Sequence, residues 1–157
     1  MKSFQSYREW QMRTMGFAFP ESELRNMFES NRDGSIGKYR TDSSVFDAIG
    51  AGVSRRNYPE IRVPVLAFFA IPSSAEENVS RRYQFKNPQE RALVEELHAA
   101  VLANIHTDEE SIQSCAAGAR VVELRGSDHY VFLASEAEVL RETQTFLAGV
   151  LRRSFMH

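Results

Sequence analysis

The spacing of apolar positions divides the chain into a helical first part and a second part in which strands and helices alternate. Between residues 3 and 15, apolar side chains recur every three or four positions, which places them on one face of a helix. Pro20 opens a second helix, and residues 41–43 cap a third helix over residues 45–53. We therefore expect residues 1–57 to form a helical segment rich in aromatic side chains.

Two short features separate the second and third of these helices. Residues 31–34, Asn-Arg-Asp-Gly, are a turn signal, and residues 36–40 have the form of a short extended piece. The side chains expected to face inward are Leu24, Met27 and Phe28 in the second helix, and Val45, Phe46, Ile49 and Val53 in the third.

The second part of the chain has a different pattern. Residues 65–71 are apolar without alternation, which is typical of a strand covered on both faces in a parallel sheet. A long helix over residues 89–114, a strand over residues 119–124 and a helix over residues 136–153 follow. This order predicts a βαβα unit whose strands are parallel neighbours or near neighbours, joined by a right-handed crossover. The expected inner faces of the helices are Leu93, Val94, Leu97, Val101, Leu102, Ile105, Val139, Leu140, Phe146, Leu147 and Val150.

Composition and charge exclude several classes of protein. The 157 residues are 43% hydrophobic and 25% charged, which is ordinary for a globular chain. The net charge of -2 favours neither nucleic acid nor an anionic membrane as a partner. No apolar run approaches the roughly 18 residues of a membrane helix. The single cysteine, Cys115, excludes an internal disulfide and suits a reducing compartment, so we expect a cytoplasmic location.

His129 is the candidate for chemistry. It lies on a loop directly after the strand of residues 119–124, where a rigid sheet can direct a side chain into a cleft. With an unperturbed pKa of about 6.5, histidine accepts and returns a proton at neutral pH. A loop histidine bonded only to nearby backbone is an equally good interpretation of this segment. His98 and His106 are eight positions apart on the long helix, without a carboxylate at ligand spacing, so we interpret both as structural or exposed and expect no metal or cofactor.

The ordered pattern resembles the C-terminal part of α/β-hydrolase-fold enzymes. The resemblance is carried by residues 61–66 leading into a strand, a helix, the strand of residues 119–124, and residues 126–132, Gly-Ser-Asp-His-Tyr-Val-Phe, before an amphipathic terminal helix. It implies an α/β fold in which residues 1–57 are a helical cap, or lid, and residues 58–157 are the C-terminal βαβα part of the hydrolase core.

The resemblance also implies a function. His129 matches the general base of the family's nucleophile–histidine–acid triad, which accepts the nucleophile's proton and later activates water or protonates the leaving group. The implied substrate of the intact parent is a small, apolar, ester-like molecule, cleaved without a cofactor. Its pocket would be lined by cap aromatics, namely Trp10, Phe17, Phe19 and Phe28.

The sequence departs from the family at the nucleophile and at the acid. It contains no G-x-S-x-G turn, which in the family precedes the cap. We therefore expect a truncated or partial hydrolase chain, or one piece of a split protein. Where many members carry an aspartate, residues 72–74 read Pro-Ser-Ser, and the nearest carboxylates are Glu76 and Glu77. Asp128 is interpreted as a loop residue, because a direct sequence neighbour rarely reaches Nδ1 of the histidine ring.

Two other functions stay open. The chain can be a non-catalytic interaction module that self-associates, because a half-sheet exposes an unpaired edge and an apolar face. It can also be an independent acid–base enzyme that uses His129 with Glu76 or Glu77. Ser73 and Ser74 follow a strand and are the serines nearest to a nucleophile's position, but they lack flanking glycines and an immediate helix.

Overall fold

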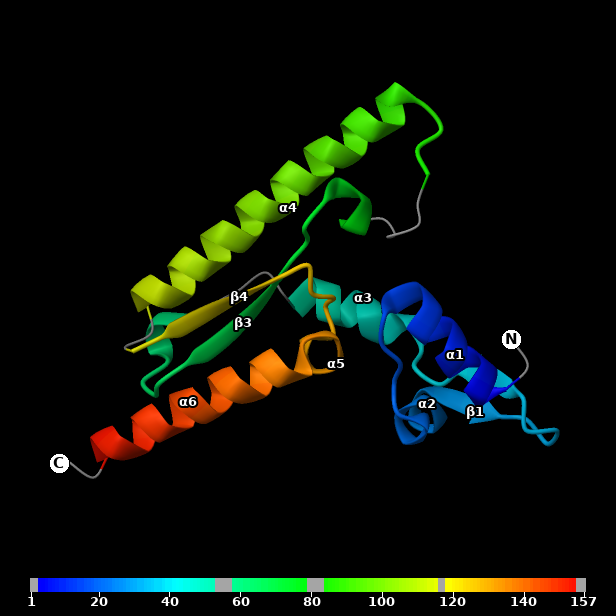
Figure 1. Ribbon diagram of the computed structural model, residues 1–157, viewed down its shortest axis with the longest axis horizontal. Helices are drawn as coiled ribbons and strands as arrows, with labels where there is room; N and C mark the ends of the chain where they lie inside the picture. Colours follow the sequence, from blue (N-terminus) through cyan, green and yellow to red (C-terminus); the bar gives the residue numbers. More distant parts are fainter. Residues whose placement is uncertain (1–2, 53–57, 79–83, 116–117, 155–157) are drawn as a thin grey trace. The chain divides into compact units, whose positions relative to one another are not determined.

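The chain forms two compact units of mixed helix and strand. The computed structural model describes residues 3–52, 58–78, 84–115 and 118–154. Contacts divide the chain into Met1–Arg56 and Asn57–His157, here called the first and the second unit. Figure 1 shows the elements of both units.

The first unit combines helices with a small hairpin. Its elements are α1 (Phe4–Met15), α2 (Glu21–Met27), β1 (Phe28–Ser30), β2 (Ile36–Tyr39) and α3 (Ser43–Gly52). The strands β1 and β2 pair antiparallel, with Phe28 opposite Tyr39. The turn predicted at residues 31–34 is confirmed, since it joins these strands and contains Gly34 in the left-handed region at φ 79°. Contrary to the expected helical segment, the first unit therefore contains two strands. The short extended piece expected at residues 36–40 is confirmed as β2.

Local sequence sets both ends of α1. Ser3 and Ser6 form a capping box in which each side-chain oxygen accepts a hydrogen bond from the other residue's backbone N–H, at 3.1 Å. At the other end, Gly16 adopts the left-handed region at φ 83° and donates its N–H to the carbonyl oxygen of Met12 at 3.2 Å. The helix thus begins and ends where its sequence predicts.

Two expectations for the first unit are wrong. Phe28 does not extend the apolar stripe of α2, because its backbone is extended and pairs with Tyr39 in the hairpin. Val45, Phe46 and Ile49 do not face inward but are exposed on α3. The hairpin covers little of this helix, although the Phe46 ring stacks on Tyr39 with the ring centroids 6.3 Å apart. The expectation for Val53 lies outside the described residues.

The second unit has the predicted βαβα order. Its elements are the short helix η1 (Tyr58–Glu60), β3 (Leu66–Ile71), the short helix η2 (Ala75–Asn78), α4 (Pro88–Cys115), β4 (Arg120–Arg125), α5 (Val131–Ala134) and α6 (Glu136–Ser154). The strands β3 and β4 are parallel neighbours, in register from Leu66 opposite Arg120 to Ile71 opposite Arg125. The predicted parallel pairing is therefore confirmed.

A helix covers each face of the β3–β4 sheet. Figure 1 shows α4 and α6 on opposite sides of the strands, and both helices contact β3. The most buried cluster consists of Leu124, Val131 and Val139, with Phe68 and Val122 packed against it. It joins the strands to α5 and α6. Leu124, with 2% of its surface exposed, lies at its centre.

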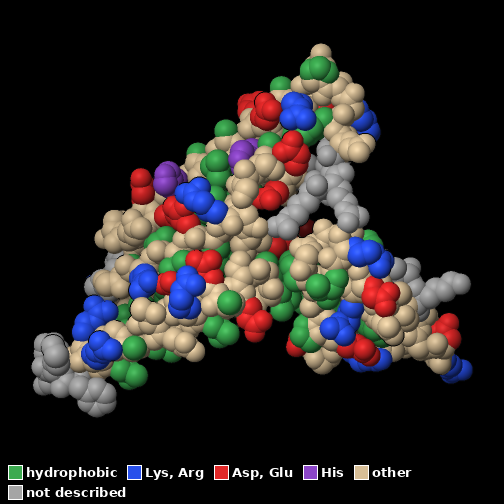
Figure 2. Space-filling view, in the orientation of Figure 1, with side chains coloured by type: hydrophobic (Ala, Val, Ile, Leu, Met, Phe, Trp, Pro, Cys, Tyr) green, Lys and Arg blue, Asp and Glu red, His purple; other side chains and the backbone are tan. Residues whose placement is uncertain are grey.

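The long helices are more exposed than their patterns predict. Val94 and Val139 are buried, but Leu93, Leu97 and Leu140 are exposed, as is Leu147. The reason is length: α4 has 28 residues and extends about 42 Å, whereas the six-residue strands extend about 20 Å. A narrow sheet therefore covers only part of each helix. Figure 2 shows apolar side chains between charged ones along α4 and α6.

Within the residues that the structure describes, no helix combines the length and the apolar character needed to cross a membrane. The side chain of the lone cysteine, Cys115, lies outside the described part.

Replacing the central core residue tests this packing. We expect Leu124→Ala to lower the free energy of unfolding of the second unit by about 2–5 kcal/mol, because it leaves a cavity between β4 and α6. Urea unfolding followed by circular dichroism measures the loss. The matched control is Leu147→Ala on α6, where the side chain is 52% exposed and the loss should be about 0.5 kcal/mol or less. Equal losses in the two variants would contradict the described core.

Candidate functional site

The loop that carries His129 leaves the sheet at the carboxyl ends of both strands. Gly126 follows β4 in the left-handed region at φ 69°, and its N–H donates to the carbonyl oxygen of Ile71 at 2.8 Å. A Cβ at this position would lie 2.9 Å from Oγ of Ser73. Glycine therefore permits both the turn and the close approach of the two strand ends. The His129 loop thus begins beside the residues that follow β3.

His129 is exposed at the position that the sequence indicates. Its ring meets the Tyr130 ring edge-on, with the centroids 5.4 Å apart. Oδ1 of Asp128 accepts the N–H of Tyr130 at 3.2 Å, a local turn that agrees with the interpretation of Asp128 as a loop residue. Among the described residues, no carboxylate contacts the His129 ring and orients it. The catalytic role of His129 stays a prediction.

The other predicted acids and serines lie after β3. Glu76 pairs with Arg91 at 3.4 Å, and Oε2 of Glu77 accepts the N–H of Ser73 at 2.6 Å. Within the described part of the chain, neither carboxylate pairs with His129. Ser73 lines a cavity of about 290 Å³ together with His98, and Nδ1 of His98 lies 2.8 Å from Nδ2 of Asn78. The structure therefore brings Ser73 to the same cavity as His98.

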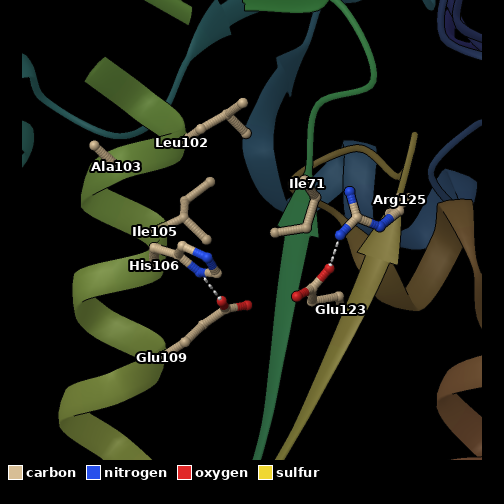
Figure 3. A pocket seen from close by; sticks show the side chains of 8 residues that line it. All are labelled: Ile71, Leu102, Ala103, Ile105, His106, Glu109, Glu123 and Arg125. Carbon is tan, nitrogen blue, oxygen red and sulfur yellow. Dashed lines mark hydrogen bonds and ion pairs between the residues drawn. The ribbon is translucent and has the colours of Figure 1, made fainter. Parts of the chain in front are cut away.

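A second cavity lies between α4 and the ends of the strands, and Figure 3 shows its side chains. Its volume is about 260 Å³. The lining consists of apolar side chains and four titratable ones: Ile71, Leu102, Ala103, Ile105, His106, Glu109, Glu123 and Arg125. We call it the α4 cavity. It shares Ile71, Leu102 and Arg125 with the cavity of Ser73 and His98, so both occupy one edge of the sheet.

A buried carboxylate is the main polar group of the α4 cavity. Glu109 is 5% exposed, and its carboxylate points from α4 toward the strands in Figure 3. Its Oε2 lies 3.0 Å from Nδ1 of His106, whereas its Oε1 has no hydrogen-bond partner among the described residues. Glu123 and Arg125 form an ion pair on β4 across the cavity.

The Glu109 contact changes the acidity of His106. The hydrogen bond and the charge of Glu109, followed by the charges of Glu110 and Glu123, raise the pKa of His106. Contrary to expectation, a carboxylate does lie at ligand spacing from one helix histidine, since Glu109 is three positions from His106 and one turn away on the same face. That spacing was the available sequence signal for this pair.

Metal binding finds no support in the cavity residues. In the described part of the chain, no three His, Cys, Asp or Glu side chains come together in a way that would hold a metal ion. The cavity instead combines one buried carboxylate, an exposed histidine and a surface ion pair with apolar side chains. This mixture suits an organic ligand that has a polar end and an apolar body.

The predicted pocket aromatics occupy the core and surface of the first unit. They are Trp10, Phe17, Phe19 and Phe28. Tyr7 stacks on Trp10 and meets Phe28 edge-on, at centroid distances of 5.5 and 5.6 Å, and Phe17 meets Phe19 edge-on at 6.1 Å. Phe17 is buried and Trp10 is exposed. The hollow described on this unit is lined by α1 side chains and Ala18 instead, so the pocket role of the four aromatics stays a prediction.

Comparison of the chain with protein-family models, with curated proteins and with solved structures found no match in any of the three. The resemblance to α/β-hydrolases therefore stays a prediction from the order of motifs along this chain.

The His106–Glu109 pair makes a prediction about titration. We expect the pKa of His106, measured by NMR of its ring protons, to lie above the ordinary histidine value. Glu109→Gln should move it back toward that value, and the control Glu110→Gln should move it less. Because the pKa is raised on folding, protonated His106 stabilises the fold at pH below its unfolded pKa, and this contribution is lost as pH rises through the folded pKa. A pKa unchanged by Glu109→Gln would contradict the described pair.

Proposed function

We propose that the second unit is the C-terminal part of a hydrolase-type parallel sheet, and that His129 is its general base in the cleavage of an ester or similar bond. One observation carries the proposal: the parallel β3–β4 pair ends beside an exposed histidine loop, which is followed by a terminal helix. The order of motifs in the sequence supports the same assignment.

The sheet geometry supports the addition of further strands. In the described residues β3 and β4 form a two-stranded sheet, so each strand has one edge that is not paired with another described strand. The carboxyl ends of parallel strands meet at one edge of a sheet. Strands added beside β3 would therefore bring a nucleophile-bearing turn to the edge that carries the His129 loop.

The exposed ring of His129 suits the chemistry of this proposal. It would accept the proton of a serine nucleophile as that oxygen attacks the ester carbonyl carbon, and would then donate this proton to the departing alcohol. In the second half-reaction it would accept a proton from the attacking water and return it to the serine. The proposed apolar pocket consists of four aromatic residues, Trp10, Phe17, Phe19 and Phe28.

The single cysteine of the chain favours a cytoplasmic location for the protein.

Co-expression with the polypeptide encoded immediately upstream tests this function. We expect the combined protein to hydrolyse p-nitrophenyl acetate and the chain alone to match buffer. His129→Ala should lower the rate of the combined protein at least roughly a thousandfold, because the nucleophile loses its base.

The matched control is Asp128→Asn, which keeps the oxygen that accepts the Tyr130 N–H and should keep the activity. If His129→Ala retains activity, or if the upstream polypeptide supplies no nucleophile turn, the hydrolase proposal is wrong. Activity of the chain alone that requires His129 would instead direct the search for a nucleophile to Ser73 and Ser74.

The exposed leucines favour a second candidate, an interaction module that pairs with another copy of the chain. Leu93 and Leu97 lie one turn apart on α4, and Leu140 and Leu147 lie two turns apart on α6. Each of these sets forms a stripe along its helix, at a spacing that a partner helix can cover. In this reading the chain needs no nucleophile.

Sedimentation velocity tests this second candidate. We expect a dimer that forms with rising concentration, and we expect Leu140→Gln combined with Leu147→Gln to return the chain to a monomer, because the polar side chains weaken apolar association. Arg152→Gln on the same helix is the control and should leave the dimer intact. A monomer at all concentrations, without binding of a dye that reports apolar surface, would count against self-association.

A further inference from the structure

The buried carboxylate of Glu109 needs a hydrogen-bond donor. The residue is 5% exposed, and Oε1 has no partner among the described residues. A buried charged oxygen without a partner costs free energy, so such groups in proteins are usually paired with a donor. His106 already occupies Oε2. Glu109 lines the α4 cavity, and its carboxylate points toward the strands in Figure 3, so a ligand in the cavity would lie beside this carboxylate.

The charges around the α4 cavity favour a cation. Glu109 comes from α4, and Glu123 and Arg125 come from β4. The Glu123–Arg125 ion pair balances itself, so the charge of Glu109 is left over when His106 is neutral. Glu110, the next residue on α4, adds a further negative charge near His106. A cation in the cavity would therefore be attracted to the Glu109 carboxylate.

The apolar part of the lining indicates an organic cation. Ile71 projects from the end of β3, and Leu102 and Ile105 project from α4 toward it in Figure 3. Within the described residues, His, Cys, Asp and Glu side chains form no group of three suited to a metal ion. Apolar side chains beside one carboxylate match a molecule with a charged end and a hydrocarbon body.

We propose that the α4 cavity binds a small alkylammonium ion, whose N–H donates to the Glu109 carboxylate while its alkyl chain packs against Ile71, Leu102 and Ile105. The volume of about 260 Å³ lies just below the roughly 300–1,000 Å³ of pockets for drug-sized ligands, so the ligand is small. The cavity lies at the carboxyl ends of β3 and β4, where open parallel sheets bind their ligands. The site does not depend on the role of His129.

Titration with n-hexylammonium, followed by amide resonances of the ¹⁵N-labelled chain, tests the proposal. We expect saturable shifts confined to residues 102–109, Ile71 and residues 123–125. Hexanoate and n-hexanol have the same chain length but a negative or neutral end, and they should cause no saturable shift. Because this comparison uses the unmodified chain, it does not depend on how a variant folds.

Glu109→Gln then tests the carboxylate itself. A charge-assisted hydrogen bond is stronger than a neutral one, so we expect this variant to bind n-hexylammonium at least roughly tenfold more weakly. Glu110→Gln, at the adjacent exposed carboxylate, is the matched control and should stay within about twofold of the unmodified chain.

Four results would overturn the proposal. Absence of saturable shifts would mean that water satisfies Glu109, and an equal response to n-hexanol would mean that the cavity selects apolar chains only. Saturation of the same resonances by Mg²⁺ or Zn²⁺ alone would assign the site to a metal ion. Unchanged binding by a folded Glu109→Gln variant would place the ligand elsewhere.

Discussion

The parallel pairing of β3 with β4 is the constraint on which the second unit depends. The ladder begins where the N–H of Arg120 donates to the carbonyl oxygen of Val65, at 2.8 Å. The ladder ends where the N–H of Gly126 donates to the carbonyl oxygen of Ile71, also at 2.8 Å. Between these ends six residue pairs are in register, from Leu66 opposite Arg120 to Ile71 opposite Arg125. The pairing therefore brings the His129 loop and the α4 cavity to a single edge of the sheet.

Alternation along the strands then gives the two faces different properties. Leu124 points to the face that α6 covers, where it forms the dry core with Val139. Its neighbours Glu123 and Arg125 point to the opposite face, because successive side chains alternate. There they meet α4 around a cavity instead of a filled core. One row of side chains on β4 thus stabilises the core, and the other row provides polar groups that can contact a ligand.

The sequence predicts the elements of the second unit well, because their signals are local. The apolar run of residues 65–71 and the β-branched residues of 119–124 indicate strands that need a partner, and the intervening helix requires a parallel crossover. The start of β1 at Phe28 was missed because its apolar side chain also continues the periodicity of α2, and only pairing with Tyr39 decides between them. Exposure of Leu93 and Leu147 depends on how much sheet lies beneath each helix, which periodicity does not encode.

The site was predictable only in part for a related reason. The position of His129 follows from the order of strand, loop and helix, but the burial of Glu109 depends on where α4 crosses the strand ends. A glutamate three positions after a histidine is ordinary on a helix surface, and it becomes a candidate binding group only through that crossing.

His129 and His106 each meet only some of the requirements of a catalytic base. His129 has the loop position and the exposure, but no orienting carboxylate among the described residues. His106 has a carboxylate on Nδ1, in the arrangement that orients a base in a triad, but it lies on a helix. A carboxylate at Nδ1 both fixes the ring and stabilises its protonated form, so a working base at His129 requires an acid as well as a nucleophile. Under the proposed function, both groups must reach the carboxyl edge of the sheet together, on strands that pair beside β3. A ligand in the α4 cavity would lie at that same edge, since Arg125 ends β4 directly before the loop that carries His129.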